Sequence, residues 1–163
     1  MKQECGLVWM SAGNSYFKEN VIIKILDLAS KNFDKVIVMS PDEPAEHTFR
    51  ALGYKEKEVK KKAKLNANLL QNRAKRAVDT LNKKEVKNNF KIVEWVDEVI
   101  PNKYYQDSLK TINNLYEKNE KFKEDTRKVT EEVLKSKTSE KIEYDKIINE
   151  AVKYLLKELA FIL

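Results

Sequence analysis

Ser11 carries a hydroxyl that could act as a nucleophile. It follows an apolar run, residues 6–10, and precedes apolar residues at helical spacing in residues 21–29, so we expect it in a turn between a strand and a helix. In open parallel sheets, ligands bind at the carboxyl ends of the strands, which makes Ser11 a candidate nucleophile. The alternative is structural, because Ser11, Asn14 and Ser15 are also residue types that form turns and cap helices.

A serine nucleophile needs a group that accepts its proton. The sequence has one histidine, His47, and a Ser-His-Asp triad stays open, although no GxSxG elbow surrounds Ser11. Neither GxGxxG nor GxxxxGK[ST] is present, so the turn lacks the signature of a dinucleotide or nucleotide cradle. An activated substrate such as an amino-acid ester would reduce the need for a protein base, because its leaving hydroxyl or its amine can carry the proton.

Tyr154 and Glu158 are four residues apart on a predicted helix and therefore share one face. A phenol hydroxyl and a carboxylate placed together can hold an ammonium group in a cleft. From the spacing alone, an ordinary surface pair is the alternative. We expect the buried stripe of this helix to consist of Ala151, Leu155, Leu159 and Ile162.

The segment 55–81 has no Pro or Gly and is the longest uninterrupted helical candidate. Apolar residues at spacings of three and four predict a buried stripe of Val59, Ala63, Ala67, Leu70, Ala74, Ala77 and Leu81. No carboxylate lies between Val59 and Val78, and like charges one turn apart repel, so the cations favour RNA-backbone binding over helix stability. A solvated surface helix is the alternative. The predicted RNA-binding residues are Lys57, Lys60, Lys61, Lys64, Arg73, Lys75 and Arg76.

Composition limits the remaining function classes. The 163 residues fit one domain, predicted over residues 1–163, and the net charge of +6 favours a polyanionic partner where the excess is clustered. Cys5 is the sole cysteine, which excludes an intramolecular disulfide and a Cys/His zinc cluster, and we expect no metal and no cofactor. The sequence shows no signal-peptide pattern and no membrane-length apolar segment, so we expect a soluble cytoplasmic protein, with a monomer favoured.

Strand-like and helix-like patterns alternate along the first half of the chain, which predicts an α/β fold, a Rossmann-like parallel sheet with flanking helices. The second half is mostly helical. The predicted elements are strands at 6–10, 36–39 and 90–96, and helices at 21–29, 45–52 (stopped by Gly53), 55–81 and within 104–163.

The turn Ser11-Ala12-Gly13-Asn14-Ser15-Tyr16-Phe17 resembles the signature turn of the tRNA-dependent cyclodipeptide synthases. The basic segments Lys61–Lys64 and Asn72–Arg76 are similar to the tRNA-binding helix of that family, and Tyr154–Glu158 is similar to its Tyr-x-x-x-Glu. Most of the chain shares this resemblance in order, through residues 33–38, 41–44 and 51–54 as well.

The resemblance implies a fold like the catalytic domain of class I aminoacyl-tRNA synthetases, and no HIGH-like or KMSKS-like sequence is present. It implies two aminoacyl-tRNAs per turnover. The first would transfer its aminoacyl group to Ser11, the amine of the second would attack that ester, and the dipeptidyl-enzyme would cyclise to a diketopiperazine. The implied catalytic residues are Ser11, Asn14 near the reacting carbonyl, and Tyr154 and Glu158 on the ammonium. The implied substrate-binding residues are Leu7, Trp9, Gly13 and Met39.

Two departures from the family pattern support a second hypothesis. Trp9 stands where relatives usually have glycine, and the chain reaches Leu163 soon after the Tyr/Glu pair, whereas typical members continue into another strand. The second hypothesis is therefore a non-catalytic aminoacyl-tRNA or RNA-binding module with an incomplete active site. A third, a basic α/β domain that acts through protein contacts, explains the charge but not the ordered motifs.

Overall fold

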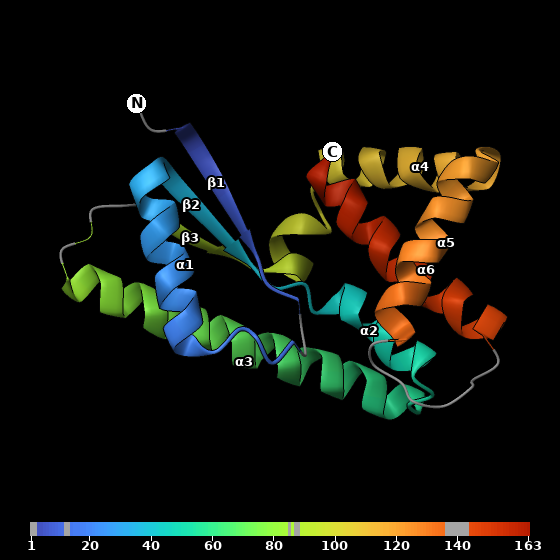
Figure 1. Ribbon diagram of the computed structural model, residues 1–163, viewed down its shortest axis with the longest axis horizontal. Helices are drawn as coiled ribbons and strands as arrows, with labels where there is room; N and C mark the ends of the chain where they lie inside the picture. The colour runs from blue at the N-terminus through green and yellow to red at the C-terminus, as the bar shows by residue number, and fades with distance from the viewer. Residues whose placement is uncertain (1–2, 12–13, 85, 87–88, 136–143) are drawn as a thin grey trace. The chain divides into compact units, whose positions relative to one another are not determined.

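The computed structural model describes residues 3–11, 14–84, 86, 89–135 and 144–163. The chain divides into two compact units, unit 1 with Met1–Asp42 and Lys64–Glu98, and unit 2 with Glu43–Ala63 and Val99–Leu163. The single domain over residues 1–163 remains a prediction. The elements, drawn in Figure 1, are β1 (Gln3–Trp9), α1 (Glu19–Asn32), β2 (Phe33–Met39), α2 (Glu43–Ala51), α3 (Glu56–Lys83), β3 (Asn89–Val93), η1 (Trp95–Val99), α4 (Lys103–Lys118), α5 (Glu120–Lys135) and α6 (Tyr144–Ile162).

Unit 1 is built on a parallel three-stranded sheet in the order β1-β2-β3. At its carboxyl end, Trp9 pairs with Met39 and Met39 pairs with Val93, so the three strands end nearly level. The sheet confirms the predicted α/β fold with a parallel sheet and flanking helices. Parallel pairing also brings the segments that follow each strand to one edge, where the turn after β1 begins.

Helices α1 and α3 pack on one face of this sheet (Figure 1). Alternation along β1 and β2 turns Val8, Val36 and Val38 toward these helices, and all three are buried. The helices contribute Ile22, Leu26, Leu70, Ala74, Ala77 and Leu81 to the same core. The predicted α3 stripe is confirmed, since each of its seven residues is at most 2% exposed. Its alanines let the helix backbone approach the sheet closely.

Unit 2 contains the helices α2, α4, α5 and α6, with α6 packed against the other three (Figure 1). The buried residues of α6 are Ile148, Ala151, Val152, Leu156 and Ala160. The stripe predicted for this helix is confirmed at Ala151 and wrong at its other three residues, so the predicted rotation was wrong. Leu155 and Leu159 are only half-buried and Ile162 is 66% exposed, because α6 carries apolar residues on more than one side and spacing alone cannot choose among them.

Two predicted boundaries have local explanations. The stop at Gly53 is confirmed: its φ is +80°, and the N–H groups of Gly53 and Tyr54 donate to Arg50 O at 2.9 Å and Phe49 O at 3.1 Å. The third strand was predicted too long, since β3 ends at Val93 and residues 95–99 form a π-helical turn. Here the Glu98 carboxylate accepts from the Glu94 N–H at 3.1 Å and ends the ladder.

Gly6 of β1 lies against the ring of Phe33, the first residue of β2, and leaves no space for a larger side chain. A Cβ at this position would lie 2.6, 2.7 and 2.9 Å from three atoms of the Phe33 ring. We predict that Gly6→Ala lowers the free energy of unfolding by about 1–3 kcal/mol, because the ring must leave its position. Urea unfolding followed by circular dichroism measures this loss.

The matched control is Leu28→Ala, which removes a side chain that is 64% exposed on α1. It should change the free energy of unfolding by less than about 0.5 kcal/mol. Equal unfolding midpoints for Gly6→Ala and the unmodified chain would contradict the packing described for β1 and β2.

Candidate active site

Ser11 lies directly after the carboxyl end of β1, as predicted. The N–H of Met10 donates to Met39 O at 2.9 Å, which is the last bond between β1 and β2, and Ser11 then leaves the ladder. Ser11 is half-buried, and its carbonyl accepts from Asn14 N at 3.2 Å. Helix α1 begins at Glu19 with Lys18 as its N-cap, so the helix-cap alternative is wrong for Ser11, Asn14 and Ser15.

Asn14 stabilises the turn that follows Ser11. Its Oδ1 accepts from Tyr16 N at 2.9 Å, and its carbonyl accepts from Phe17 N at 3.4 Å. A side-chain oxygen that bonds to the backbone two residues on is an Asx-turn. Asn14 is exposed, and its predicted contact with the reacting carbonyl remains a prediction. Ala12 and Gly13, the latter a predicted substrate-binding residue, lie outside the described residues.

The other predicted substrate-binding residues, Leu7, Trp9 and Met39, share one face of the sheet. Register pairs Leu7 with Ile37 and Trp9 with Met39, and these positions alternate with the ones that face α1 and α3. The exposure of these side chains decreases toward the carboxyl end of the strands. Leu7 is 45% exposed, Trp9 is half-buried and Met39 is fully buried. The three therefore lie on the sheet face opposite the two helices, with Trp9 two residues before Ser11.

Trp9 is held by an aromatic neighbour that the sequence reasoning missed. The rings of Trp9 and Trp95 meet edge to face, with their centroids 5.8 Å apart and an interplanar angle of 81°. Trp95 is 1% exposed and begins η1, two residues after β3 ends. This contact restrains the Trp9 indole beside the turn of Ser11. The signal in the sequence was a tryptophan directly after a strand of the same sheet.

Tyr154 and Glu158 lie in unit 2, on α6, one turn apart as predicted. Both are half-buried. Ser11 and Asn14 belong to unit 1, so the structure brings the candidates together as two pairs, each described within its own unit. Tyr154 and Glu158 combine a hydroxyl and a carboxylate on one helix face, a set suited to an ammonium ligand.

The predicted RNA-binding residues of α3 fall into two groups. Lys57, Lys60, Lys61, Lys64 and Lys75 are all exposed, and we call these five lysines the α3 basic surface. Arg73 and Arg76 are engaged in unit 1. Arg73 Nη1 donates to Phe17 O at 3.0 Å, and Arg76 Nε lies 2.6 Å from a carboxylate oxygen of Glu19. The two arginines thus hold Phe17, which lies just before α1, and Glu19, with which α1 begins, and charge patterning did not reveal these contacts.

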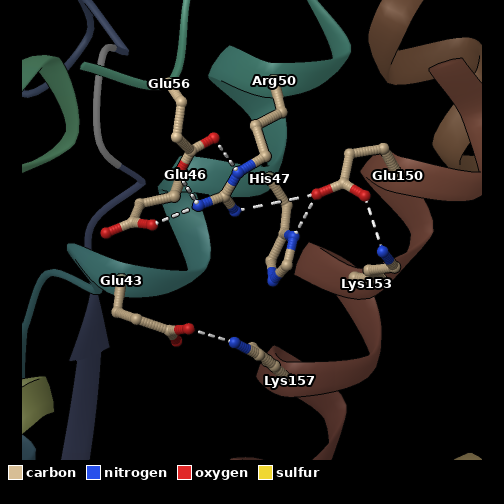
Figure 2. A network of polar contacts seen from close by, with 8 residues as sticks. All are labelled: Glu43, Glu46, His47, Arg50, Glu56, Glu150, Lys153 and Lys157. Carbon is tan, nitrogen blue, oxygen red and sulfur yellow. Dashed lines mark hydrogen bonds and ion pairs between the residues drawn. The ribbon is translucent and has the colours of Figure 1, made fainter. Parts of the chain in front are cut away.

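His47 is part of a polar network between α2 and α6 in unit 2 (Figure 2). Its Nδ1 lies 2.6 Å from Glu150 Oε1. Burial raises the pKa of Glu150, but hydrogen bonds from Lys153 and His47 outweigh burial and hold it below its usual value. An ionised carboxylate only accepts, so Nδ1 donates. Burial lowers the pKa of His47 despite this bond, which favours the neutral imidazole.

The acidic partner of His47 is therefore Glu150 rather than an aspartate, and sequence reasoning did not identify it. Charged residues at Glu43, His47 and Arg50 recur at helical spacing on α2, as do Glu150 and Lys157 on α6, and this repetition was the available signal. A Ser-His-Asp triad finds no support in these contacts, because the hydrogen-bonded neighbours of His47 and Ser11 belong to different units.

Two kinds of feature, a membrane-spanning helix and a metal-binding cluster, are absent from the described residues. Within the described ranges, no helix is long and apolar enough to cross a membrane. Among the same residues, no group of three or more His, Cys, Asp or Glu side chains is arranged to hold a metal ion.

The chain is similar to known proteins over nearly its whole length. The family model for cyclodipeptide synthases matches residues 2–163. A cyclodipeptide synthase from Bacillus thermoamylovorans superposes with a TM-score of 0.82 at 27% identity, covering 99% of this chain and 70% of that one. One from Staphylococcus haemolyticus gives 0.81 at 24% identity, with 98% and 70% covered. A comparison with curated proteins gave no match.

A third structure bears on the fold. The Mycobacterium tuberculosis protein, at a TM-score of 0.79, 18% identity and coverage of 98% and 66%, was described as showing that cyclodipeptide synthetases are related to type I tRNA synthetases. This agrees with the parallel sheet and flanking helices of unit 1. Together with the match over residues 2–163, these likenesses establish that the chain belongs to the cyclodipeptide synthase family.

Proposed function

We propose that this chain joins two aminoacyl groups from aminoacyl-tRNAs into a cyclic dipeptide through an ester on Ser11. The observation that carries this proposal is the half-buried serine at the carboxyl end of β1, in a chain of the cyclodipeptide synthase family. A serine at this edge of a parallel sheet stands where ligands of such folds bind. Asn14, exposed in the same turn, supplies an amide close to the reacting carbonyl.

The first step is acyl transfer. Ser11 Oγ attacks the carbonyl of the first aminoacyl ester, the bond to the ribose oxygen breaks, and the leaving hydroxyl takes up the serine proton. The substrate is already an activated ester, so no strong protein base is required at Ser11. Tyr154 and Glu158 hold the ammonium of the aminoacyl group.

The second step follows from atom balance. For a dipeptide to remain on Ser11, the amine of the serine-bound residue must attack the carbonyl of the second aminoacyl-tRNA. The bond from this carbonyl to the ribose oxygen breaks, and the leaving hydroxyl takes up the proton that the amine loses on forming the amide. The direction of attack predicted from the resemblance, in which the amine of the second aminoacyl-tRNA is the nucleophile, is therefore wrong, because it would leave the dipeptide on tRNA. The attacking amine must first lose a proton, and the carboxylate of Glu158 can accept it. The new terminal amine then attacks the Ser11 ester and releases the diketopiperazine and the free serine.

The α3 basic surface is the proposed contact for tRNA. Its lysines are exposed over more than four helical turns, and phosphate contacts of this kind position a nucleic acid without reading its bases. We assign Arg73 and Arg76 a smaller contribution, because Arg73 donates to Phe17 O and Arg76 pairs with Glu19 at the start of α1. This narrows the predicted set of seven cations to five lysines.

One observation favours a second function, a non-catalytic aminoacyl-tRNA-binding module. The Trp9 indole, which contacts Trp95 edge to face, stands two residues before Ser11, and we expect an indole there to limit the space for a substrate side chain. A catalytic site beside it has to accept small side chains, whereas a binding module has no such requirement.

Ser11→Ala tests the ester. We predict that the diketopiperazines made by cells expressing the unmodified chain disappear with this variant, because the nucleophile is gone. Mass spectrometry of medium and lysate provides the measurement and also identifies the joined amino acids. Ser15→Ala, an exposed serine of the same turn, is the control and should retain the product. Product that persists without the Ser11 hydroxyl would rule out the ester, and no product from any chain, with tRNA still bound, would favour the binding module.

Charge reversal tests the α3 basic surface. Lys61→Glu combined with Lys64→Glu should weaken binding of all tRNAs alike by about tenfold or more and reduce the slope of log affinity against log salt by about two. Filter binding over a salt series measures both. The matched control is Lys118→Glu with Lys121→Glu, which reverses two exposed lysines elsewhere. Equal losses for both pairs would show a general charge effect rather than a surface on α3.

Glu158→Gln tests the ammonium contact while it preserves the size of the side chain. We predict a fall in turnover of about 100-fold, with tRNA affinity within about twofold, because the carboxylate acts on the aminoacyl group and its proton. Single-turnover assays and tRNA binding separate the two effects. Glu132→Gln on α5 removes an exposed carboxylate and serves as control. Parallel losses of turnover and tRNA affinity would remove Glu158 from this role.

A further inference from the structure

The helices α2 and α6 of unit 2 are joined by polar contacts at both ends of their interface (Figure 2). Lys157 Nζ donates to Glu43 Oε1 at one end. At the other, Glu150 Oε1 lies 2.6 Å from His47 Nδ1 and 3.7 Å from Arg50 Nη1. Residue numbers rise along α2 as they fall along α6, so the helices run antiparallel. We call Glu43, His47, Arg50, Glu150 and Lys157 the α2–α6 clamp.

The clamp is itself restrained on the α2 side. Arg50 Nη2 lies 2.6 Å from Glu46 Oε2 and 2.8 Å from Glu56 Oε1, so its guanidinium connects α2 to the first residue of α3 (Figure 2). The hydrogen bonds that Arg50 donates, the one to Glu56 above all, hold its pKa above the usual value despite burial. Because the guanidinium is held in this way, its Nη1 faces Glu150 from a fixed position.

Stability alone does not account for these contacts. The side chains of His47 and Glu150 are 12% and 22% exposed, and those of Lys157 and Glu43 are 21% and 29% exposed. Partly buried ion pairs seldom stabilise a fold more than apolar residues of the same volume. Their directional hydrogen bonds do restrict how two helices are placed. Apolar contacts alone do not specify the rotation of α6 about its axis, because this helix carries apolar residues on several sides.

The α6 residues of the clamp lie close in sequence to the proposed ammonium-binding residues. Tyr154 lies one helical turn after Glu150 and three residues before Lys157, and Glu158 directly follows Lys157. A slip of α6 by one residue would rotate these side chains by about 100° and shift them by about 1.5 Å. A misplacement of about 1 Å can lower a reaction rate by about 100-fold. The contacts that prevent such a slip therefore bear on catalysis.

His47 is the most specific member of the clamp. Its Nε2 is buried and has no hydrogen-bond partner among the described residues, so the ring is oriented by its Nδ1 bond to Glu150. The neutral ring, which burial favours by lowering the pKa of His47, carries its proton on Nδ1 for this bond. His47 thus acts as a single directional donor from α2 to α6.

We propose that the α2–α6 clamp, through the His47–Glu150 hydrogen bond above all, is a positioning device that sets α6 so that Tyr154 and Glu158 meet the aminoacyl group. His47 is a positioning residue in this arrangement and does not touch the reacting atoms. This inference rests on the proposed function, because Tyr154 and Glu158 matter to turnover only where an ammonium is bound.

The decisive comparison is between two substitutions of His47. Asparagine carries an N–H close to the place of Nδ1, whereas leucine of similar volume has no donor. With purified protein and the aminoacyl-tRNAs identified by the product, His47→Leu should lower turnover by about tenfold or more at unchanged tRNA affinity, and His47→Asn should recover most of that loss. Lys153→Met is the matched control. It removes a 2.6 Å ion pair to the same Glu150 carboxylate, but one within α6, and should keep turnover within about twofold.

A spectroscopic readout makes the test independent of turnover. The chain is labelled with 3-fluorotyrosine, and among its seven tyrosines Tyr154 is assigned by the signal lost in Tyr154→Phe. The ¹⁹F resonance of Tyr154 should shift or broaden in His47→Leu, return in His47→Asn and stay in place in Lys153→Met. If the unmodified chain made no product, the proposed function would fail, and this resonance alone would decide whether the clamp holds α6.

Two results would overturn the inference. One is turnover of His47→Leu within about twofold of the unmodified chain, together with an unmoved Tyr154 resonance. The other is an equal loss of turnover and melting temperature in His47→Leu and His47→Asn, which would show a folding role that the N–H donor does not rescue.

Discussion

The parallel pairing of β1 with β2 is the constraint on which the candidate active site depends. Met10 N–H to Met39 O is the last bond between these strands, and Ser11 is the first residue beyond it. The ladder holds its register because Val8, Val36 and Val38 must face the core under α1 and α3, and a slip by one residue would turn them to the other face. The position of the serine is thus set by apolar packing on the opposite side of the sheet.

Helix α3 has a buried side, which takes part in that packing, and an exposed side, which is the proposed RNA contact. Its buried side is mostly alanine, and small side chains allow a helix backbone to lie close to its neighbours. Its exposed side carries the α3 basic surface, whose mutual repulsion is tolerated because burial of the other side stabilises the helix. Arg73 and Arg76 link the two roles, since they hold Phe17 just before α1 and Glu19 at its start.

The sequence predicted most elements and the position of Ser11, because these depend on local patterns. Short apolar and β-branched runs marked the first two strands, alternation marked the third, spacing marked α3, and Gly53 marked a helix end. The sequence did not predict the features that depend on tertiary contacts. The end of β3 at Val93 depends on the Glu98 side chain, and the T-shaped contact of Trp9 depends on Trp95, a residue 86 positions away. The pairing of His47 with Glu150 spans 103 residues, beyond any local signal.

The rotation of α6 shows why such long-range polar contacts matter to function. The predicted stripe of this helix was wrong because apolar residues surround much of it, so several rotations bury similar area. A hydrophobic pattern of that kind specifies that the helix packs but not which side turns outward. Glu150 and Lys157 distinguish among these rotations, because only one rotation of α6 lets both side chains reach their polar partners on α2. Residues that choose a rotation also choose where Tyr154 and Glu158 point, although they touch no substrate.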